Sequence, residues 1–272
     1  MGDMDYHYEL LRQPGLHLSN HEQASLKQDL RSLGALCLHP LPNYQVFSDD
    51  PGSLDDKIAV TAHRINGTKR QLVGFVATVL LDISFEGVES PVLHGGLTVV
   101  HPAHRQQGLP VALFARFFAD AVTCREGTIW VTNLSGLPRT LSHFYAFVDN
   151  VFPAPSRSTP SPEHVQIART IAERHRSKML IASSATFDEG SFTFRGSNAS
   201  DEALAFRKSE DDASFAHANK TASDFYHSLL RDGSGDEVLQ VGTISRTHLM
   251  QFLEQKRFEG DQIELRKFLG ID

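Results

Sequence analysis

Residues 97–114 of the 272-residue chain read LTVVHPAHRQQGLPVALF, and this stretch decides the fold that the sequence predicts. Its first part, through Val100, is rich in β-branched and apolar residues and is typical of a strand. From Leu109 onward the apolar residues recur at helical spacing, and Pro110 suits the first turn of a helix. The polar residues 105–108 lie between the two, so we expect a strand, a short loop and a helix in succession.

A strand that enters a helix through such a loop can form an anion site. The first turn of a helix leaves backbone N–H groups unpaired, and the aligned peptide dipoles place partial positive charge there. Gly108 has no Cβ, so a pyrophosphate could approach the backbone closely, and Arg105 could add a charge-assisted hydrogen bond. The amides that would bind it are those of Gln106, Gln107, Gly108 and Leu109. A glycine turn with a nearby arginine also occurs where nothing binds, so both interpretations stay open.

Strand and helix signals flank this segment on both sides. The runs 58–65 and 71–81 are joined by Asn66-Gly67-Thr68-Lys69, a strong hairpin signal. The run 92–100 contains Gly95-Gly96, where glycine indicates a bulge or the close approach of another group. We expect further strands at 6–12, 128–132, 192–194 and 238–244, and helices at 19–33, 109–122, 141–148, 163–178, 201–231 and 246–268. This order predicts an α/β or α+β fold.

The composition is that of a folded protein without an excess of basic residues. Hydrophobic residues make up 40% and charged residues 22% of the chain, close to globular averages. The net charge of −7 disfavours binding to nucleic acid. No apolar run approaches the roughly 20 residues of a membrane span, and the acidic N-terminus does not resemble a signal peptide. We therefore expect a cytoplasmic protein that binds neither nucleic acid nor membrane.

The sequence does not predict a metal site. The two cysteines, Cys37 and Cys124, lack a neighbouring Cys or His at metal-ligand spacing, and we interpret both as buried, reduced thiols. His101 and His104 have no further clustered ligand, and no His-Glu-x-x-His arrangement occurs. Motifs for nucleotide hydrolysis, dinucleotide binding and the hydrolase nucleophile elbow are also absent from the sequence.

Two segments are expected to contribute little to the core. Residues 40–57 are rich in Pro, Asp, Asn, Gly and Ser, and we interpret them as a surface loop. The tract 153–162 reads PAPSRSTPSP and is interpreted as a linker or long loop. We thus divide the chain into a core over 1–152, the linker, and a C-terminal extension over 163–272.

The segment 97–114 and its surroundings resemble the GNAT superfamily of acyltransferases. In that family Arg or Gln, two residues, Gly, one residue and then Gly or Ala form the loop for the acyl-CoA pyrophosphate. Arg105, Gly108 and Pro110 fall on these positions, although Pro110 departs from the pattern and lacks an N–H. The likeness covers roughly residues 58–152. It implies a GNAT-like α+β fold: a mixed, mostly antiparallel twisted sheet flanked by helices, with an enlarged C-terminal part.

The resemblance also implies acetyl-CoA as co-substrate and assigns residues to it. The splayed end of the fourth strand would put Leu97 and Val99 beside the pantetheine arm, and Asn133 would bond pantetheine. The residues expected to bind the co-substrate are Leu97, Val99, Arg105, Gln106, Gln107, Gly108, Leu109, Val111 and Asn133. Tyr145 would protonate the departing thiolate, and its alternative role is that of a core aromatic on a helix face.

The base that takes a proton from the acceptor amine is open. No acid lies within 93–100, and His94 is the nearest titratable residue on that strand. Asp82 and Glu86, in the loop after the third strand, are alternatives. All three also have an ordinary interpretation, His94 as a half-exposed strand residue and the two acids as solvated loop carboxylates.

These observations predict an N-acyltransferase that moves an acetyl or other acyl group from acyl-CoA to an amine by direct attack in a ternary complex. Because the chain beyond residue 152 exceeds a minimal family domain and is expected to complete the sheet and cover the acceptor pocket, a small-molecule acceptor is favoured. A homodimer is compatible with the sequence. The competing hypothesis is a catalytically inert relative that serves as a binding or interaction module.

Overall fold

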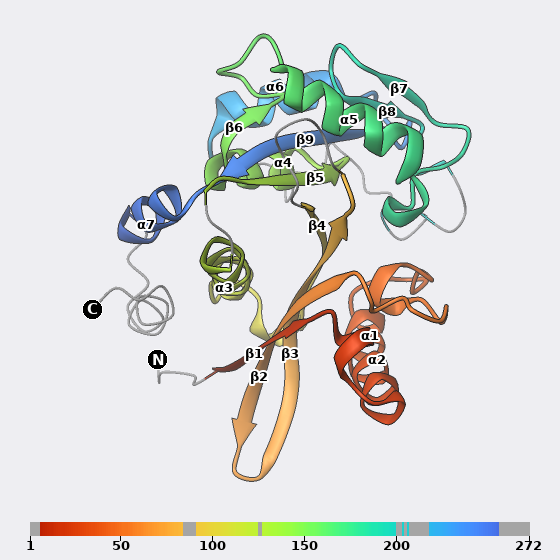
Figure 1. Ribbon diagram of the computed structural model, residues 1–272, viewed down its shortest axis with the longest axis vertical. Coiled ribbons are helices and arrows are strands. Elements are labelled where there is room, and N and C mark those ends of the chain that lie inside the picture. Colours follow the sequence, from red (N-terminus) through yellow and green to blue (C-terminus); the bar gives the residue numbers. More distant parts are fainter. Residues whose placement is uncertain are drawn as a thin grey trace. The chain divides into compact units, whose positions relative to one another are not determined.

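The computed structural model describes residues 6–83, 91–124, 127–199, 203, 206 and 218–255. The chain forms two compact units, each assembled from separate segments (Figure 1). The first consists of Met1–Leu80, Gly96–Gly127 and Ser245–Asp272, and the second of Leu81–Gly95 and Thr128–Ile244. The division of the sequence at 153–162 stays a prediction.

The first unit contains an antiparallel arrangement of N-terminal strands. Its strands are β1 (Tyr6–Arg12), β2 (Lys57–Asn66), β3 (Lys69–Leu81) and the second half of β4 (Val92–Val100), and its helices are α1 (Pro14–His17), α2 (Asn20–Ala35), α3 (Leu109–Thr123) and α7 (Arg246–Gln255). Val60 of β2 pairs with Leu10 of β1 on one side and Val76 of β3 on the other. Asn66 pairs with Lys69, so the predicted hairpin is confirmed.

Local sequence signals explain where the helices of this unit begin. The Ser19 hydroxyl accepts a hydrogen bond from the Glu22 amide at 3.3 Å, and the Glu22 carboxylate accepts one from the Ser19 amide at 2.9 Å. This reciprocal capping box starts α2. Helix α3 buries one broad apolar face, which includes Leu113 and Phe117, and packs against β2 and α7.

The second unit is arranged around β9 (Glu237–Ile244), every residue of which is buried. Its other strands are the first half of β4, β5 (Ile129–Ser135), β6 (Asp149–Phe152), β7 (Thr186–Asp188) and β8 (Thr193–Arg195), and its helices are α4 (Pro138–Phe147), α5 (Pro162–Arg174) and α6 (Lys220–Leu229). Strand β9 pairs with β5, β6 and β8. Helix α5 packs against β9, and α4 packs against α6 and β5.

The strand pairing confirms the predicted fold class. The pairs β1–β2, β2–β3, β5–β9, β6–β9, β7–β8 and β8–β9 are antiparallel, and the pair β4–β5 is parallel. The protein is thus a mixed α+β structure with a mostly antiparallel sheet and flanking helices. The helices expected to reach residues 201 and 268 are described only as α6 and α7, and the remainder of both lies outside the described residues.

Two expectations about burial were wrong. The segment 40–57 contains a short 3-10 helix, Gln45–Phe47, in which Val46 and Phe47 are both 0% exposed. The Phe47 ring packs edge-on against the Phe75 ring at 5.9 Å between centroids, a contact that the polar composition of the segment hides. Cys37 is half-buried and Cys124 exposed, because each follows the end of a helix and lies beyond its buried face.

The Pro/Ser-rich tract 153–162 is built into the second unit. Ala154 is 2% exposed and forms a bridge with Arg157. The Ser161 amide donates to Nδ1 of His164 at 3.2 Å at the start of α5. His164 is itself buried and contacts the carbonyl of Asn150 through Nε2 at 2.6 Å.

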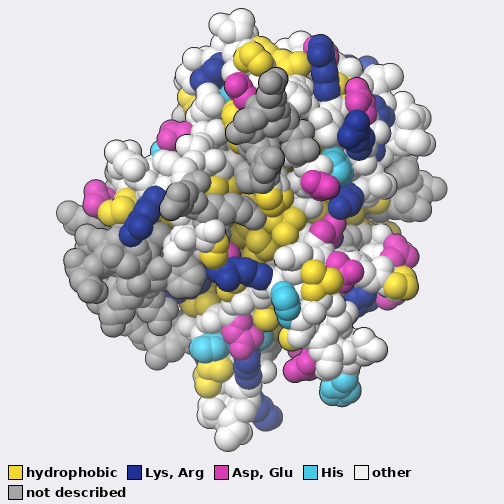
Figure 2. Space-filling view, viewed as in Figure 1, with side chains coloured by type: hydrophobic (Ala, Val, Ile, Leu, Met, Phe, Trp, Pro, Cys, Tyr) yellow, Lys and Arg dark blue, Asp and Glu magenta, His cyan; other side chains and the backbone are white. Residues whose placement is uncertain are grey.

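Charges of both signs are mixed on the surface. On the face that Figure 2 shows, the Lys and Arg side chains lie among Asp and Glu side chains rather than in one group. Within the described part of the chain, no helix is long and apolar enough to cross a bilayer. The same residues contain no group of three or more His, Cys, Asp or Glu side chains that could hold a metal ion.

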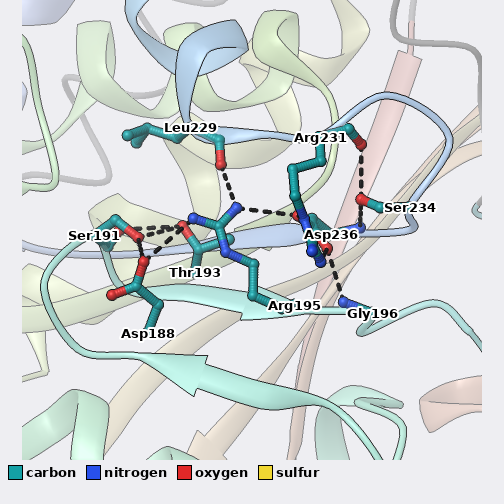
Figure 3. A network of polar contacts seen from close by, with 9 residues as sticks. All are labelled: Asp188, Ser191, Thr193, Arg195, Gly196, Leu229, Arg231, Ser234 and Asp236. Carbon is teal, nitrogen blue, oxygen red and sulfur yellow. Dashed lines mark hydrogen bonds and ion pairs between the residues drawn. The ribbon is translucent and has the colours of Figure 1, made fainter.

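A buried carboxylate organises the start of β9 (Figure 3). Asp236 is 1% exposed and accepts two hydrogen bonds from Arg231, both at 2.8 Å, and one from Arg195 at 3.0 Å. The Gly196 amide adds another at 2.8 Å. Burial by itself would raise the pKa of Asp236, but the hydrogen bonds from Arg231, the Gly196 amide and Arg195 outweigh it and hold this pKa well below its usual range.

Strand β4 changes its surroundings at two glycines. Its pairing with β5 ends at Gly95, opposite Asn133. A Cβ on Gly96 would lie 2.6 Å from the Ala77 carbonyl oxygen and would collide with the Gln45 side chain. The close approach that glycine indicated is therefore found at Gly96. A Cβ on Gly95 would meet only the Thr132 carbonyl oxygen, at 3.3 Å.

We predict that Asp236→Asn destabilises the protein in a pH-dependent way. Because the folded-state pKa of Asp236 is depressed below its unfolded value of about 3.9, its contribution is present above about pH 4 and is lost as the pH falls through the folded-state pKa. Removing this partner of two arginines should cost about 3 kcal/mol at pH 7. Urea unfolding of both proteins between pH 3 and 7 measures this, and a gap that does not narrow on acidification contradicts it.

We further predict that Gly96→Ala is more damaging than Gly95→Ala. The Ala77 carbonyl belongs to a neighbouring strand and cannot move aside, so the methyl group at position 96 should cost about 1–3 kcal/mol. The methyl group at position 95 needs only a small shift. Equal losses of unfolding free energy for the two variants would show that the backbone contact at Gly96 is unimportant.

Candidate active site

The loop before α3 is exposed, and backbone amides at the start of the helix lie in it. A 3-10 helix, Pro102–His104, follows β4, and residues 105–108 after it are exposed. Gly108 adopts a φ of 77°, a left-handed conformation that other residues adopt at a cost, and immediately precedes α3. No side chain caps the helix at this position. The predicted strand, loop and helix are therefore confirmed.

The hydrogen bonds of this loop show which amides are already used. The amides of Val111 and Ala112 donate to the Gly108 carbonyl at 3.0 and 3.1 Å, and the Arg105 amide donates to the Pro102 carbonyl at 3.4 Å. Pro110 has no N–H. In the described residues no acceptor is bonded to the amides of Gln106, Gln107, Gly108 and Leu109. These four amides are the ones expected to bind the pyrophosphate, whereas the Val111 amide is occupied.

The Arg105 side chain folds back over the end of β4. Its Nε lies 3.4 Å from the Val100 carbonyl oxygen, and a terminal nitrogen lies 3.4 Å from Sγ of Cys37. The Cys37 thiol also donates to the Val100 carbonyl at 3.4 Å. These contacts keep the guanidinium at the base of the loop, within the same unit as the four amides.

The remaining residues expected at the co-substrate lie on β4. Leu97 and Val99 are buried and belong to the part of β4 after Gly95, where the paired register with β5 has ended. Because the β4–β5 pairing ends at Gly95, the backbone groups of Leu97 and Val99 are not paired with β5. The expectation that pantetheine runs along this stretch stays a prediction.

His94 lies on the first half of β4, in the second unit. It is 2% exposed, and its Nδ1 lies 3.0 Å from the Thr132 hydroxyl, directly across the β4–β5 pair. The expected half-exposed histidine is therefore a buried one. Asp82 is exposed at the end of β3, and Glu86 lies outside the described residues.

Asn133 belongs to a buried polar network. Its Nδ2 donates to Gln240 Oε1 at 3.0 Å, and Gln240 Nε2 donates to the Tyr226 hydroxyl at 2.7 Å and the Leu141 carbonyl at 3.1 Å. The Tyr226 hydroxyl in turn donates to the Pro153 carbonyl at 3.0 Å. Burial raises the pKa of Tyr226, so its phenol stays protonated.

Gln240 and Tyr226 were not expected at this site from the sequence. A glutamine inside the apolar strand run 238–244 was the available signal, because a buried amide is retained only with hydrogen-bond partners. Tyr226 gave no comparable signal, since an aromatic on a helix face is ordinary.

Tyr145 is half-buried on α4. Its hydroxyl donates to the Ser156 hydroxyl at 3.1 Å, and its ring packs against the cluster that includes Leu141 and Tyr226. These contacts fit an ordinary helix-face aromatic, and the catalytic role stays a prediction.

The structure thus brings the expected site residues together in two groups. Leu97, Val99, residues 105–109 and Val111 belong to the first unit, and His94, Asn133 and Tyr145 to the second. The first group provides backbone amides without a bonded acceptor in the described residues, beside an arginine. The second provides a buried imidazole, an oriented amide and a phenol.

Comparison with known proteins finds likeness in structure alone. No protein-family model matches the sequence, and no curated protein matches it. The acetyl-CoA complex of Arabidopsis thaliana NAA60 has a TM-score of 0.40 at 12% identity, over 88% of this chain and 99% of that chain. An aminoglycoside acetyltransferase from an uncultured soil metagenomic sample has a TM-score of 0.33 at 21% identity, over 47% of this chain and 77% of that chain. A GNAT family acetyltransferase from Brucella melitensis in complex with acetyl-CoA has a TM-score of 0.31 at 15% identity, over 46% of this chain and 75% of that chain. These likenesses concern the fold alone.

Proposed function

We propose that this protein is an acyl-CoA-dependent N-acyltransferase. The observation that carries the proposal is the set of four backbone amides at residues 106–109, unbonded within the described chain, at the start of α3. An uncapped helix start beside an arginine suits a diphosphate group, because amide donors and the helix dipole both favour negative charge.

The geometry of the loop fits this co-substrate. The left-handed Gly108 turns the chain so that the loop remains exposed, and the absence of a Cβ leaves room for phosphate oxygens. Pro110 removes one donor from the family pattern, and the amides before it remain. Arg105, held by Cys37 and Val100, supplies the positive charge.

When bound, acyl-CoA supplies a thioester whose acyl carbon an amine attacks, with release of CoA as the thiol. In this proposal Leu97 and Val99 of β4 hold the pantetheine arm, and Asn133 bonds it. Tyr145 donates a proton to the departing sulfur, and His94 accepts the amine proton directly or through water, with Asp82 as the alternative. Positioning the two reactants provides most of the acceleration.

We infer a small-molecule amine as the acceptor, because the chain continues well beyond residue 152 and contributes α5, α6 and β7–β9. The second candidate function is a binding module without turnover. The bond between Tyr145 and Ser156 and the lack of an acid in 93–100 favour it.

The proposal predicts that Arg105→Glu and Gly108→Asp weaken acetyl-CoA binding by at least 10-fold. Charge reversal removes a charge-assisted hydrogen bond worth about 1.5–3 kcal/mol, and the aspartate adds repulsion at the amides. Calorimetric titration measures both. Lys69→Glu, the same charge change at an exposed hairpin position, is the matched control. Wild-type affinity in both loop variants would exclude this loop as the pyrophosphate site.

The proposal also predicts that Tyr145→Phe lowers kcat about 100-fold without weakening acetyl-CoA binding. Thiol release over a panel of amines measures turnover. Ser156→Ala is the control, because it removes the same hydrogen bond and leaves the phenol in place. Equal losses in the two variants would show that the hydroxyl serves only to contact Ser156, and binding without any turnover in wild type would favour the inert module.

A further inference from the structure

The Tyr6 hydroxyl contacts one residue just before the exposed loop and one residue within it. It lies 2.9 Å from Nδ1 of His104 and donates a hydrogen bond to Oε1 of Gln107. Tyr6 belongs to β1, and these contacts span 98 and 101 residues of sequence. His104 ends the 3-10 helix before the loop, and Gln107 supplies one of the four amides. A strand far away in the sequence thus contacts the loop at Gln107 and the residue before the loop, His104.

The chemistry of the three groups fixes the direction of the two hydrogen bonds. An amide oxygen only accepts, so the single phenol hydrogen of Tyr6 goes to Gln107. The Tyr6 oxygen then accepts from His104, which must carry its proton on Nδ1. The result is a relay from the His104 Nδ1–H to the Tyr6 hydroxyl and from that hydroxyl to Gln107.

The surroundings of His104 support this arrangement. The ring is 5% exposed and packs edge-on against Tyr6 at 5.8 Å and against His101 at 5.5 Å between centroids. Burial, with contributions from His101 and Arg64, lowers the pKa of His104, which favours the neutral ring that the relay requires.

The loop needs such support because its backbone is unfavourable on its own. Gln106 has a φ of 62°, in the left-handed region that residues with a side chain adopt at a cost. It lies between His104 and Gln107, the two residues that the relay holds. Contacts that hold His104 and Gln107, on either side of Gln106 in the chain, therefore favour the conformation in which the four amides are exposed.

We propose that Tyr6 is a positioning residue for the acyl-CoA loop, acting through His104 and Gln107 to hold the amides of residues 106–109 in place for a pyrophosphate. This inference rests on the proposed function. Under this proposal, a residue of β1, outside the loop, contributes to the affinity for the co-substrate.

The test compares ligands with and without a pyrophosphate. Tyr6→Phe should raise the Kd of acetyl-CoA about 5- to 10-fold, the loss of a hydrogen bond that orders the site. S-acetylpantetheine lacks the pyrophosphate, so its kcat/KM should be the same in Tyr6→Phe and wild type. A merely structural effect would weaken both ligands alike and would overturn the proposal.

Matched variants separate the relay from general damage. His104→Asn retains an N–H donor near the position of Nδ1 and should keep wild-type affinity, whereas His104→Leu should match Tyr6→Phe. Tyr8→Phe removes a phenol two residues along β1, whose ring lies under the Arg116 guanidinium at 3.4 Å, and should leave acetyl-CoA affinity unchanged. Loss in His104→Asn as large as in His104→Leu would contradict the relay.

Spectroscopy gives an independent readout, and the outcomes distinguish the two proposals. Nitrogen-15 NMR of wild type at pH 7 should show His104 protonated at Nδ1, and protonation at Nε2 would overturn the relay. If Arg105→Glu abolishes acetyl-CoA binding and Tyr6→Phe binds as wild type does, only the role of Tyr6 fails. If wild type does not bind acetyl-CoA, both proposals fail.

Discussion

The left-handed turn at Gly108 is the constraint on which the candidate site depends. Helices α2 and α6 begin with a side chain that accepts a hydrogen bond from a free amide, Ser19 in α2 and Asn219 in α6, whereas α1 and α4, like α3, begin without such a cap. Helix α3 has glycine at this position, and no side chain of the described residues caps its start. The chain can form caps, and at this helix it has none. An uncapped helix start next to an exposed loop is compatible with a ligand that supplies its own negative charge.

An uncapped loop must be held by contacts to its other atoms, and β1 provides them at two places. Tyr6, at the beginning of β1, contacts His104 just before the loop and Gln107 within it. Arg12, at its end, pairs with the buried carboxylate of Asp120 in α3, with Nε at 2.9 Å from the acid. One strand thus contacts both the entrance of α3 and its last turns. Because β1 also pairs with β2 along its whole length, the residues that contact the loop and α3 from this strand are themselves held in a sheet.

The parts of the fold that the sequence predicted are those with local signals. The Asn66-Gly67 turn, the Ser19 capping box and the change from strand to helical spacing around Gly108 each act within a few residues, so they can be read without tertiary structure. The short strands β6 and β7 have no such signal and exist because β9 and β8 pair with them. The burial of Phe47 depends on Phe75, and the network around Asn133 depends on Gln240, 107 residues away. Sequence spacing contains no information about such contacts.

The same distinction separates the loop from the proposed acid–base groups. The loop is a continuous segment whose conformation has local signals, whereas the role of an imidazole, amide or phenol depends on its partners elsewhere in the chain. For Asn133 the partners decide the orientation: Gln240 takes a hydrogen from Nδ2, which identifies Oδ1 as the acceptor. The Gln240 amide is itself oriented, because its nitrogen donates to Tyr226 and Leu141. In the proposed complex, a pantetheine amide would therefore donate its N–H to Oδ1 of Asn133, and the uncharged hydrogen-bond network of Gln240 and Tyr226 would set that orientation.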